Sequence, residues 1–207
     1  MNNHGRDRLG WSEEIWNRID QAVHDEAQRT KVAAKFLPLY VATPGEMTVP
    51  AELIAPAEGR KQQLVVDEAA TVSIVEILVE FALTSQQYER ESGLMTAVTL
   101  ATRATNLLSQ GEDLVCFQGS RAVEEDELFI NGRVRKQSGS AGKGLLLLDS
   151  LPKEQVIPVK VSEIVTGQPK WGENTFGAVA AGYAQLQANG HYGPYALALP
   201  PKPFGDT

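Results

Sequence analysis

The sequence has few of the residues and patterns that mark secreted, disulfide-bonded or membrane proteins. Among its 207 residues there is one cysteine, Cys116, which excludes an intramolecular disulfide and is typical of a reducing compartment. Its apolar runs, such as Leu145–Leu148, are far shorter than the roughly 20 residues of a membrane-spanning helix. The amino terminus has no apolar region typical of a secretory signal. We therefore expect a soluble cytoplasmic protein that does not contact a membrane.

Basic residues and histidines are also scarce. The chain has 19 Lys and Arg residues against 26 Asp and Glu residues, for a net charge of −7. Because a nucleic-acid-binding protein normally presents a basic face, we expect no specific nucleic-acid partner. The three histidines are scattered, and only Asp20 and His24 are paired at helical spacing, which is too few ligands for a metal site. We predict neither a metal nor a cofactor.

Catalytic motifs are missing as well. The glycine-rich segment 139–144 resembles a phosphate-binding loop, but Gln137 stands where that loop needs glycine and Gly144 where it needs serine or threonine. Cys116 lies in an apolar run, where an inert buried thiol is usual. The acidic run 124–127 lacks the alternating ligands of a calcium loop, and no Gly-x-Ser-x-Gly sequence occurs. A triad built from distant residues stays open, but we predict no catalytic residue and no enzyme.

A strand followed by one long helix is the clearest structural pattern in the sequence. Over residues 72–83 the odd-numbered positions from 75 onward are apolar and the others include two glutamates, which predicts a strand with one buried face. Thr84 and Gln87 have the spacing of a capping box. Residues 86–110 contain no proline, and their apolar residues recur every three or four positions. We expect a single helix of roughly 37 Å that ends at Gly111.

Two segments of different character precede this pattern. Ser12 is predicted to begin an amphipathic helix that ends before Pro38. Its apolar stripe consists of Ile15, Trp16, Ile19, Val23 and Ala27. Such a stripe must cover either the chain's own core or a partner. Residues 43–70 contain three prolines between short strand-like pieces, and they predict an extended loop or hairpin between two packed parts.

Shorter elements are predicted after the long helix. Apolar residues on both sides of Asn131-Gly132 are typical of a β-hairpin over 128–134, and Leu145–Leu148 is expected to begin a buried segment. Further elements are a strand over 156–165, a helix within 172–190 that is centred on 176–186 and stops at Gly190, and a strand over 195–199. Because that last strand needs neighbours, we expect that the chain is truncated or that other copies supply them.

Five short motifs, in the same order along almost the whole chain, resemble the encapsulins, which are bacterial nanocompartment shell proteins with the tailed-phage capsid fold. The motifs are Trp16–Asp20 with Lys35-Phe36, then Glu80–Thr84, Glu112–Gly119, Gly142–Leu146 and Gly193–Leu197. The resemblance implies an α+β, tailed-phage capsid-like fold. Such a fold has an amino-terminal helix, an extended loop, a peripheral domain with a long spine helix, and an axial domain.

The resemblance also implies how the chain is divided and what it does. The domain limits would be 1–42 for an arm with the amphipathic helix, 43–70 for the extended loop, 71–149 for the peripheral domain with spine helix and hairpin, and 150–207 for the start of an axial domain. Many identical copies would self-assemble into a cytoplasmic icosahedral container that encloses cargo enzymes. The cargo would be a ferritin-like protein or a dye-decolourising peroxidase, held by a short tail peptide.

In the family, the tail docks in a groove formed by the amino-terminal helix and nearby peripheral-domain residues. The apolar positions of this sequence nearest that groove are Ile19, Val23, Ala27, Phe36 and Leu37. Packing of the same residues on the chain's own core is an equal alternative. Two other functions stay open. One is the major capsid protein of a tailed phage or prophage, which the amino-terminal helix disfavours, and the other is a hydrolytic enzyme, for which no nucleophile with a base is evident.

Overall fold

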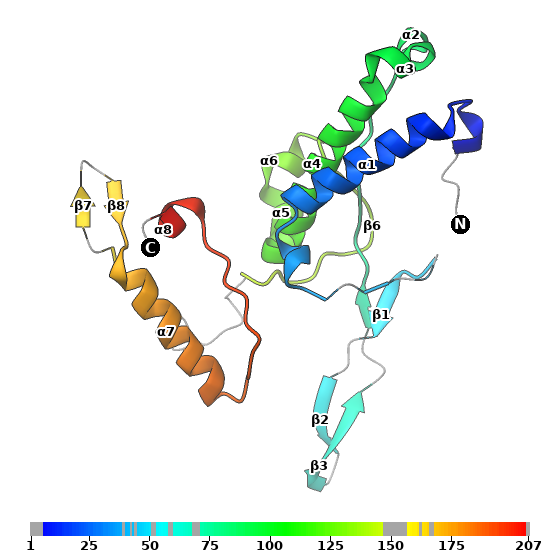
Figure 1. The fold of residues 1–207 in the computed structure, drawn as a ribbon. Helices are drawn as coiled ribbons and strands as arrows, with labels where there is room; N and C mark the ends of the chain where they lie inside the picture. The colour runs from blue at the N-terminus through cyan, green and yellow to red at the C-terminus, as the bar shows by residue number, and fades with distance from the viewer. Residues whose placement is uncertain are drawn as a thin grey trace. The chain divides into compact units, whose positions relative to one another are not determined.

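The computed structural model describes residues 6–38, 40–41, 43, 45–50, 53–57, 60–67, 71–146, 157–161, 163–165 and 168–205. The chain divides into unit 1 (Met1–Leu147) and unit 2 (Leu148–Thr207). Both units contain helices and small antiparallel sheets (Figure 1), so the mixed α+β class is confirmed. The finer domain limits stay a prediction. In the described part of the chain, no helix combines the length and apolar character that a membrane crossing requires.

Unit 1 is built on two long helices that lie side by side (Figure 1). A short helix, η1 (Arg6–Arg8), precedes α1 (Glu13–Thr30), which packs along α4 (Thr96–Gln118). Ala97 and Ala101 of α4 are 2% and 7% exposed, and Ile19 of α1 belongs to the same buried cluster. Small alanine side chains on α4 leave room for the larger apolar side chains of α1. The apolar stripe of the amino-terminal helix therefore covers the chain's own core.

The predicted single spine helix is broken near its start. Instead of one helix from residue 86, the chain forms α2 (Ser85–Glu89) and α3 (Glu91–Leu94) before α4 begins. Met95 separates α3 from α4 in the left-handed conformation, with φ of 51°, which costs a non-glycine residue about 1–2 kcal/mol. The predicted capping box of Thr84 and Gln87 is confirmed, but it begins the short α2.

A buried carboxylate and a close packing contact explain why α4 starts later and ends later than predicted. Glu91, 2% exposed, accepts hydrogen bonds from the amides of Ala97 and Val98 at 2.8 and 3.2 Å. Amides in the first turn of a helix have no partner within it, so Glu91 stabilises a new start there. Gly111 does not end the helix: a Cβ at this position would lie 3.2 Å from Val134, so the glycine permits close packing instead.

The carboxyl end of α4 is closed by a segment from farther along the chain, residues 142–146, which we call the α4 clasp. Gly119 follows the helix with φ of 63°. The clasp donates the amides of Leu145 and Leu146 to carbonyls of the last turn of α4, at 2.9 and 2.7 Å. These carbonyls have no partner within the helix, so the clasp supplies the hydrogen-bond donors that they need. The stretch that resembles a phosphate-binding loop therefore has a structural role.

The predicted β-hairpin over residues 128–134 is wrong. The elements here are α5 (Ser120–Glu125), α6 (Glu127–Ile130) and β6 (Arg135–Ser138). The Asn131-Gly132 turn thus follows a helix, and β6 pairs antiparallel with β5 (Glu76–Leu78). Leu128 and Val134, 8% and 0% exposed, lie in one core cluster. The apolar residues on both sides of the turn serve that shared core, which is why they resemble two strands.

The strands of unit 1 form two-stranded antiparallel sheets. The pairs are β1 (Thr48–Pro50) with β4 (Thr71–Ser73), β2 (Leu53–Ala57) with β3 (Arg60–Asp67), and β5 with β6. Residues 43–70 therefore contain a hairpin, which we call the β2–β3 ribbon, enclosed by the β1–β4 pair. The predicted strand over 72–83 is correct only in part because it is divided between β4 and β5. Glu76 and Glu80 are exposed as predicted, whereas Phe81, predicted to be buried, is 46% exposed.

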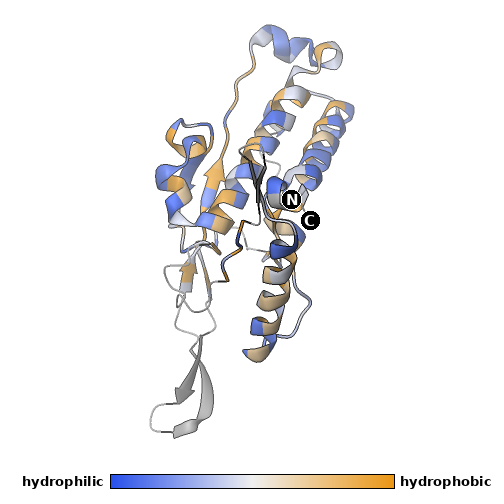
Figure 2. Ribbon diagram, turned by 90° about the vertical axis from the view of Figure 1, so that its left-hand side faces the viewer, coloured by the Kyte–Doolittle hydropathy of each residue, from blue (hydrophilic) through white to orange (hydrophobic). Residues whose placement is uncertain are grey.

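Unit 2 contains one main helix, α7 (Glu173–Ala188), close to the predicted position, and Gly190 follows it with φ of 81°. Figure 2 shows most of α7 in apolar colours. The other elements are β7 (Glu163–Val165), which pairs with β8 (Gln168–Lys170), and α8 (Pro201–Gly205). Residues 195–199 form no strand, contrary to prediction, because no described strand pairs with them.

Two predictions near residue 150 fall partly outside the described residues. Leu145 and Leu146 are 56% and 61% exposed, so a buried segment does not begin with them, and residues 147–148 lie outside the described part. In the predicted strand over 156–165, residues 157–161 form no strand. Only β7 corresponds to that prediction.

Substitution of Gly144 by alanine tests the α4 clasp. A Cβ at Gly144 would lie 2.3 Å from the backbone nitrogen of Gly119, so the backbone would have to move. We expect the free energy of unfolding to fall by at least about 2 kcal/mol. Gly142→Ala is the matched control, because nothing lies within 4 Å of its Cβ. Urea unfolding followed by circular dichroism measures both, and equal losses of stability would contradict the clasp.

Candidate functional site

The five residues predicted to line a docking groove divide between a core and a surface. Ile19, 9% exposed, and the half-buried Val23 belong to the cluster between α1 and α4. Ala27 is half-buried near the end of α1, and Leu37 is half-buried beyond it. Phe36 is 37% exposed. Their role in docking stays a prediction, but the structure shows that Ile19 and Val23 already have partners on α4.

The surface part of this set contains an aromatic pair. The rings of Phe36 and Phe117, the latter near the end of α4, are centred 6.1 Å apart and tilted by 40°. Aromatic pairs of this kind contribute about 0.5–1.5 kcal/mol beyond the burial of their area. Because the Phe36 ring is partly exposed, the pair offers apolar and aromatic surface to a ligand while remaining fixed to α4.

A carboxylate fixes the chain segment that carries Phe36. Asp113 of α4 accepts hydrogen bonds from the amides of Val32 at 3.0 Å and Ala33 at 2.7 Å, where the short helix η2 (Ala33–Lys35) begins. Phe117 follows Asp113 by four residues, so both side chains lie on the same face of α4. The turn after α1 is thereby held on the carboxyl half of α4, next to the aromatic partner of Phe36.

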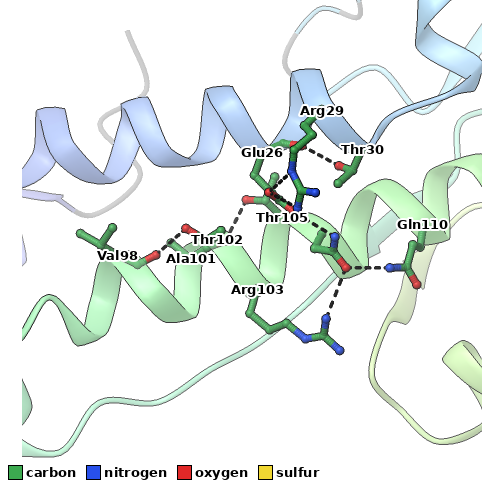
Figure 3. A network of polar contacts seen from close by, with 10 residues as sticks. Glu26, Arg29, Thr30, Val98, Ala101, Thr102, Arg103, Thr105 and Gln110 are labelled. Atoms are coloured by element: carbon green, nitrogen blue, oxygen red, sulfur yellow. Dashed lines mark hydrogen bonds and ion pairs between the residues drawn. The ribbon is translucent and has the colours of Figure 1, made fainter.

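A second carboxylate, Glu26, joins α1 itself to α4 (Figure 3). Glu26 is 7% exposed and accepts hydrogen bonds from Arg29 at 2.8 and 3.0 Å and from the side-chain amide of Asn106 on α4 at 2.8 Å. The bonds from Arg29, and then that from Asn106, hold the pKa of Glu26 below its usual value, although burial opposes them. Lys31 and Glu112 form an ion pair at 2.6 Å that adds a third polar contact between the end of α1 and α4.

The amino end of α1 is fixed by aromatic and charged contacts instead. Arg6 pairs with Asp20 at 2.5 Å and lies 4.8 Å from the centre of the Trp16 ring. Trp11 contacts Trp16 and Tyr88, with ring centres 5.3 and 5.4 Å away, and donates its indole N–H to the Tyr88 carbonyl at 3.1 Å. Asp20 therefore has an arginine partner rather than a histidine. The described part of the arm lies against α1 and α2.

None of these contacts assembles a reactive group. Burial, and then nearby carboxylates, raise the pKa of the Cys116 thiol, which keeps it neutral and weakly nucleophilic at pH 7. Within the described ranges, no three or more His, Cys, Asp or Glu side chains gather as a metal site would require. The acidic run 124–127 has structural partners, because Glu125 pairs with Arg121 at 2.7 Å and Asp126 caps α6.

The candidate site is thus the turn after α1, held on α4 by carboxylates, with an aromatic pair at its edge. Comparison of the chain with protein-family models and with curated proteins finds no match. Its function must be inferred from the surfaces of the chain itself.

Sequence reasoning identified Phe36 but missed its partner Phe117 and both carboxylate anchors. The contacts Ala33–Asp113 and Glu26–Asn106 each join residues 80 positions apart. Because both contacts join residues separated by the same number of positions, α1 and the turn after it run parallel to α4. A single alignment of these segments therefore accounts for both contacts. No local periodicity reveals such an offset. The sequence signal that could have indicated the Glu26 contact is the place of this polar residue, directly beside the apolar stripe of α1 and facing α4.

Replacement of Glu26 by glutamine tests its role through the pH dependence of stability. A carboxyl group whose pKa is lowered on folding stabilises the protein above its unfolded pKa, here 4.5, and that stabilisation is lost as the pH falls further, through the folded pKa. We expect Glu26→Gln to be less stable than the unmodified protein at pH 7, and the difference to shrink below pH 4.5.

Urea unfolding at pH 7, 5, 4 and 3 measures this difference. Glu124→Gln, a change at an exposed carboxylate of α5, is the matched control and is expected to have little effect. A difference for Glu26→Gln that stays constant from pH 7 to pH 3 would show that the carboxylate contributes through its shape rather than its charge.

Proposed function

We propose that the chain is a shell subunit of an icosahedral nanocompartment of the encapsulin type, with the tailed-phage capsid-like fold. Many copies assemble in the cytoplasm around cargo enzymes. The arm with its helix comprises residues 1–42, and the extended loop comprises residues 43–70. The peripheral domain comprises residues 71–149, and residues 150–207 form the start of the axial domain. The observation that carries the proposal is the β2–β3 ribbon, whose strands are hydrogen-bonded to each other and to no other described strand.

An isolated two-stranded ribbon is at best marginally stable in water. Its outer edges pair with no other described strand. Proteins normally cover such edges because their N–H and C=O groups invite pairing with other chains. In a closed symmetric assembly, every copy meets the same surface of its neighbour, so one type of contact covers every ribbon. The ribbon is therefore better suited to a subunit of an assembly than to a protein that acts alone.

The motifs that carry the resemblance also support the proposal through their contacts. Gly142–Leu146 is the α4 clasp, and Glu112–Gly119 is the helix end that it closes. Trp16–Asp20 contributes Ile19 to the core between α1 and α4. Motifs that act together in one fold support a resemblance more strongly than scattered matches do. Gly193–Leu197 forms no strand here, so it supports the proposal by its sequence alone.

The proposal places the cargo tail at the end of α1. Ile19 is covered by α4, so a tail peptide would reach the Phe36–Phe117 pair and the neighbouring Leu37 first. The expected cargo is a ferritin-like protein or a dye-decolourising peroxidase. The packing of α1 along α4 favours a cellular container over the capsid protein of a phage, in which a scaffolding segment or a free arm would be typical.

Replacement of the ribbon tests the proposal. Pro50 and Thr71 are paired across β1 and β4, so an Asn-Gly turn in place of residues 51–70 removes the ribbon and keeps that pair closed. We expect the unmodified chain to form uniform closed particles in negative-stain electron microscopy and size-exclusion chromatography. The ribbon-free variant should keep its helical circular dichroism and form no such particles.

The control changes only Glu58, which lies between the strands of the ribbon in sequence, to asparagine, and so places Asn-Gly there. This variant should form the same particles as the unmodified chain. Two results would contradict the proposal: an unmodified chain that stays monomeric at high concentration, or a ribbon-free variant that still forms closed particles.

A further inference from the structure

The two strands of the β2–β3 ribbon differ in how well their outer edges can accept a further strand. β2 has 5 residues and contains Pro56, which has no N–H to donate. β3 has 8 residues and contains neither proline nor glycine. Within a sheet, proline is confined to edge strands, where the side that lacks the donor faces away from the ladder. β2 therefore suits the outermost position of a sheet, and β3 is the strand that can take a neighbour.

The features that interrupt pairing lie at one end of the ribbon. Between Leu53–Pro56 and Leu64–Asp67 the two strands are paired residue by residue. The register shifts after Pro56, so that Ala57 lies opposite Arg60 and residues 61–63 lie opposite no residue of β2. Irregularities of this kind disfavour pairing with a further strand. The regular edge of β3 is thus its second half, Leu64–Asp67.

The charges of β3 are complementary to those of a second β3 that runs in the opposite direction. The strand begins with the basic residues Arg60 and Lys61 and ends with the acidic residue Asp67. In an antiparallel pair of such strands, the basic end of each lies toward the acidic end of the other. A parallel pair in register would instead place like charges side by side, which is destabilising. Within one ribbon Asp67 lies opposite Leu53, so these charges are not paired across it.

We propose that β3 pairs antiparallel with β3 of a second copy through Leu64–Asp67. The pairing joins two ribbons into one sheet with β2 at both of its outer edges. Each copy presents the same surface to the other, as a two-fold interface requires. The edge of β3, which pairs with no other described strand, gains a partner, and Pro56 lies at an edge that needs no donor. This inference rests on the proposed shell function and identifies the part of the neighbouring copy that the ribbon meets.

Proline substitutions at opposite positions of the ribbon test which edge is used. Opposite residues of an antiparallel pair direct their N–H groups alike, both inward or both outward, and the direction alternates along the strand. Ile54 and Val66 are opposite each other, so Ile54→Pro and Val66→Pro disturb the ribbon's own ladder alike. They differ in the outer edge that loses a donor. Ala55→Pro and Val65→Pro form a second matched pair.

The position of Pro56 indicates which matched pair faces outward. Ile54 precedes it by two residues and has the same direction, so the outward pair is Ile54 with Val66. In the full-length protein we expect Val66→Pro to abolish the closed particles seen by negative-stain electron microscopy and size-exclusion chromatography. Ile54→Pro should keep them. Ala55→Pro and Val65→Pro remove a hydrogen bond inside the ribbon, so their effects on assembly should be equal.

Charge reversal tests the antiparallel direction separately. Asp67→Lys places a positive charge near Arg60 and Lys61 of the second copy. At low salt it should raise the concentration at which half of the chains assemble by about threefold. Adding Arg60→Asp and Lys61→Asp should restore the original concentration. The two ends of β3 are roughly 20 Å apart along one strand, so this rescue requires a second copy.

Several results would overturn the inference. One is an equal effect of the β2 and β3 prolines in both matched pairs. Another is loss of particles in Ile54→Pro but not in Val66→Pro, and a third is a triple charge variant that assembles no better than Asp67→Lys. If the unmodified chain forms particles, these results contradict the pairing of β3 and not the shell proposal. An unmodified chain that forms no particles would contradict both.

Discussion

The structure of unit 1 depends on how the two ends of α4 obtain their hydrogen bonds. A helix leaves four amides at its start and four carbonyls at its end without partners. Glu91 supplies a carboxylate to the amides of Ala97 and Val98, and the α4 clasp supplies amides to the carbonyls of the last turn. With both ends satisfied, α4 becomes the platform on which α1 packs in parallel. The position of Phe36 follows, because Asp113 of α4 holds the segment that carries it.

Features encoded by neighbouring residues were predictable from the sequence. The capping box at Thr84, the amphipathic α1 and the position of α7 each depend on signals within a few residues. The predictions failed where a local signal serves a distant partner. Gly111 permits the approach of Val134, and the apolar residues around Asn131-Gly132 share one core, so neither acts as its local pattern indicates.

The candidate site shows the same division. Ile19 and Val23 were identified from the apolar stripe of α1, but the stripe alone does not say whether it faces the chain's own core or a partner. The carboxylates Glu26 and Asp113 could not be placed, because their partners lie about 80 residues away. Whether a polar residue is buried between two helices depends on how the helices are aligned with each other. The sequence of one helix does not contain that alignment.

The functional account is based on surfaces that have no partner among the described residues of the chain. The β2–β3 ribbon pairs with no other described strand, which suggests that its edges meet a partner. A repeated protein neighbour suits the ribbon because main-chain groups along an edge match another copy of the same chain.

The central claim is that the ribbon is covered by a neighbouring copy. Cryo-electron microscopy of the assembled full-length protein tests it most directly, because the contacts of the ribbon can be traced in the map. The account predicts closed icosahedral particles in which each ribbon lies on the adjacent subunit. A protein that remains monomeric, or particles in which each ribbon folds back onto the helices of its own subunit, would contradict it.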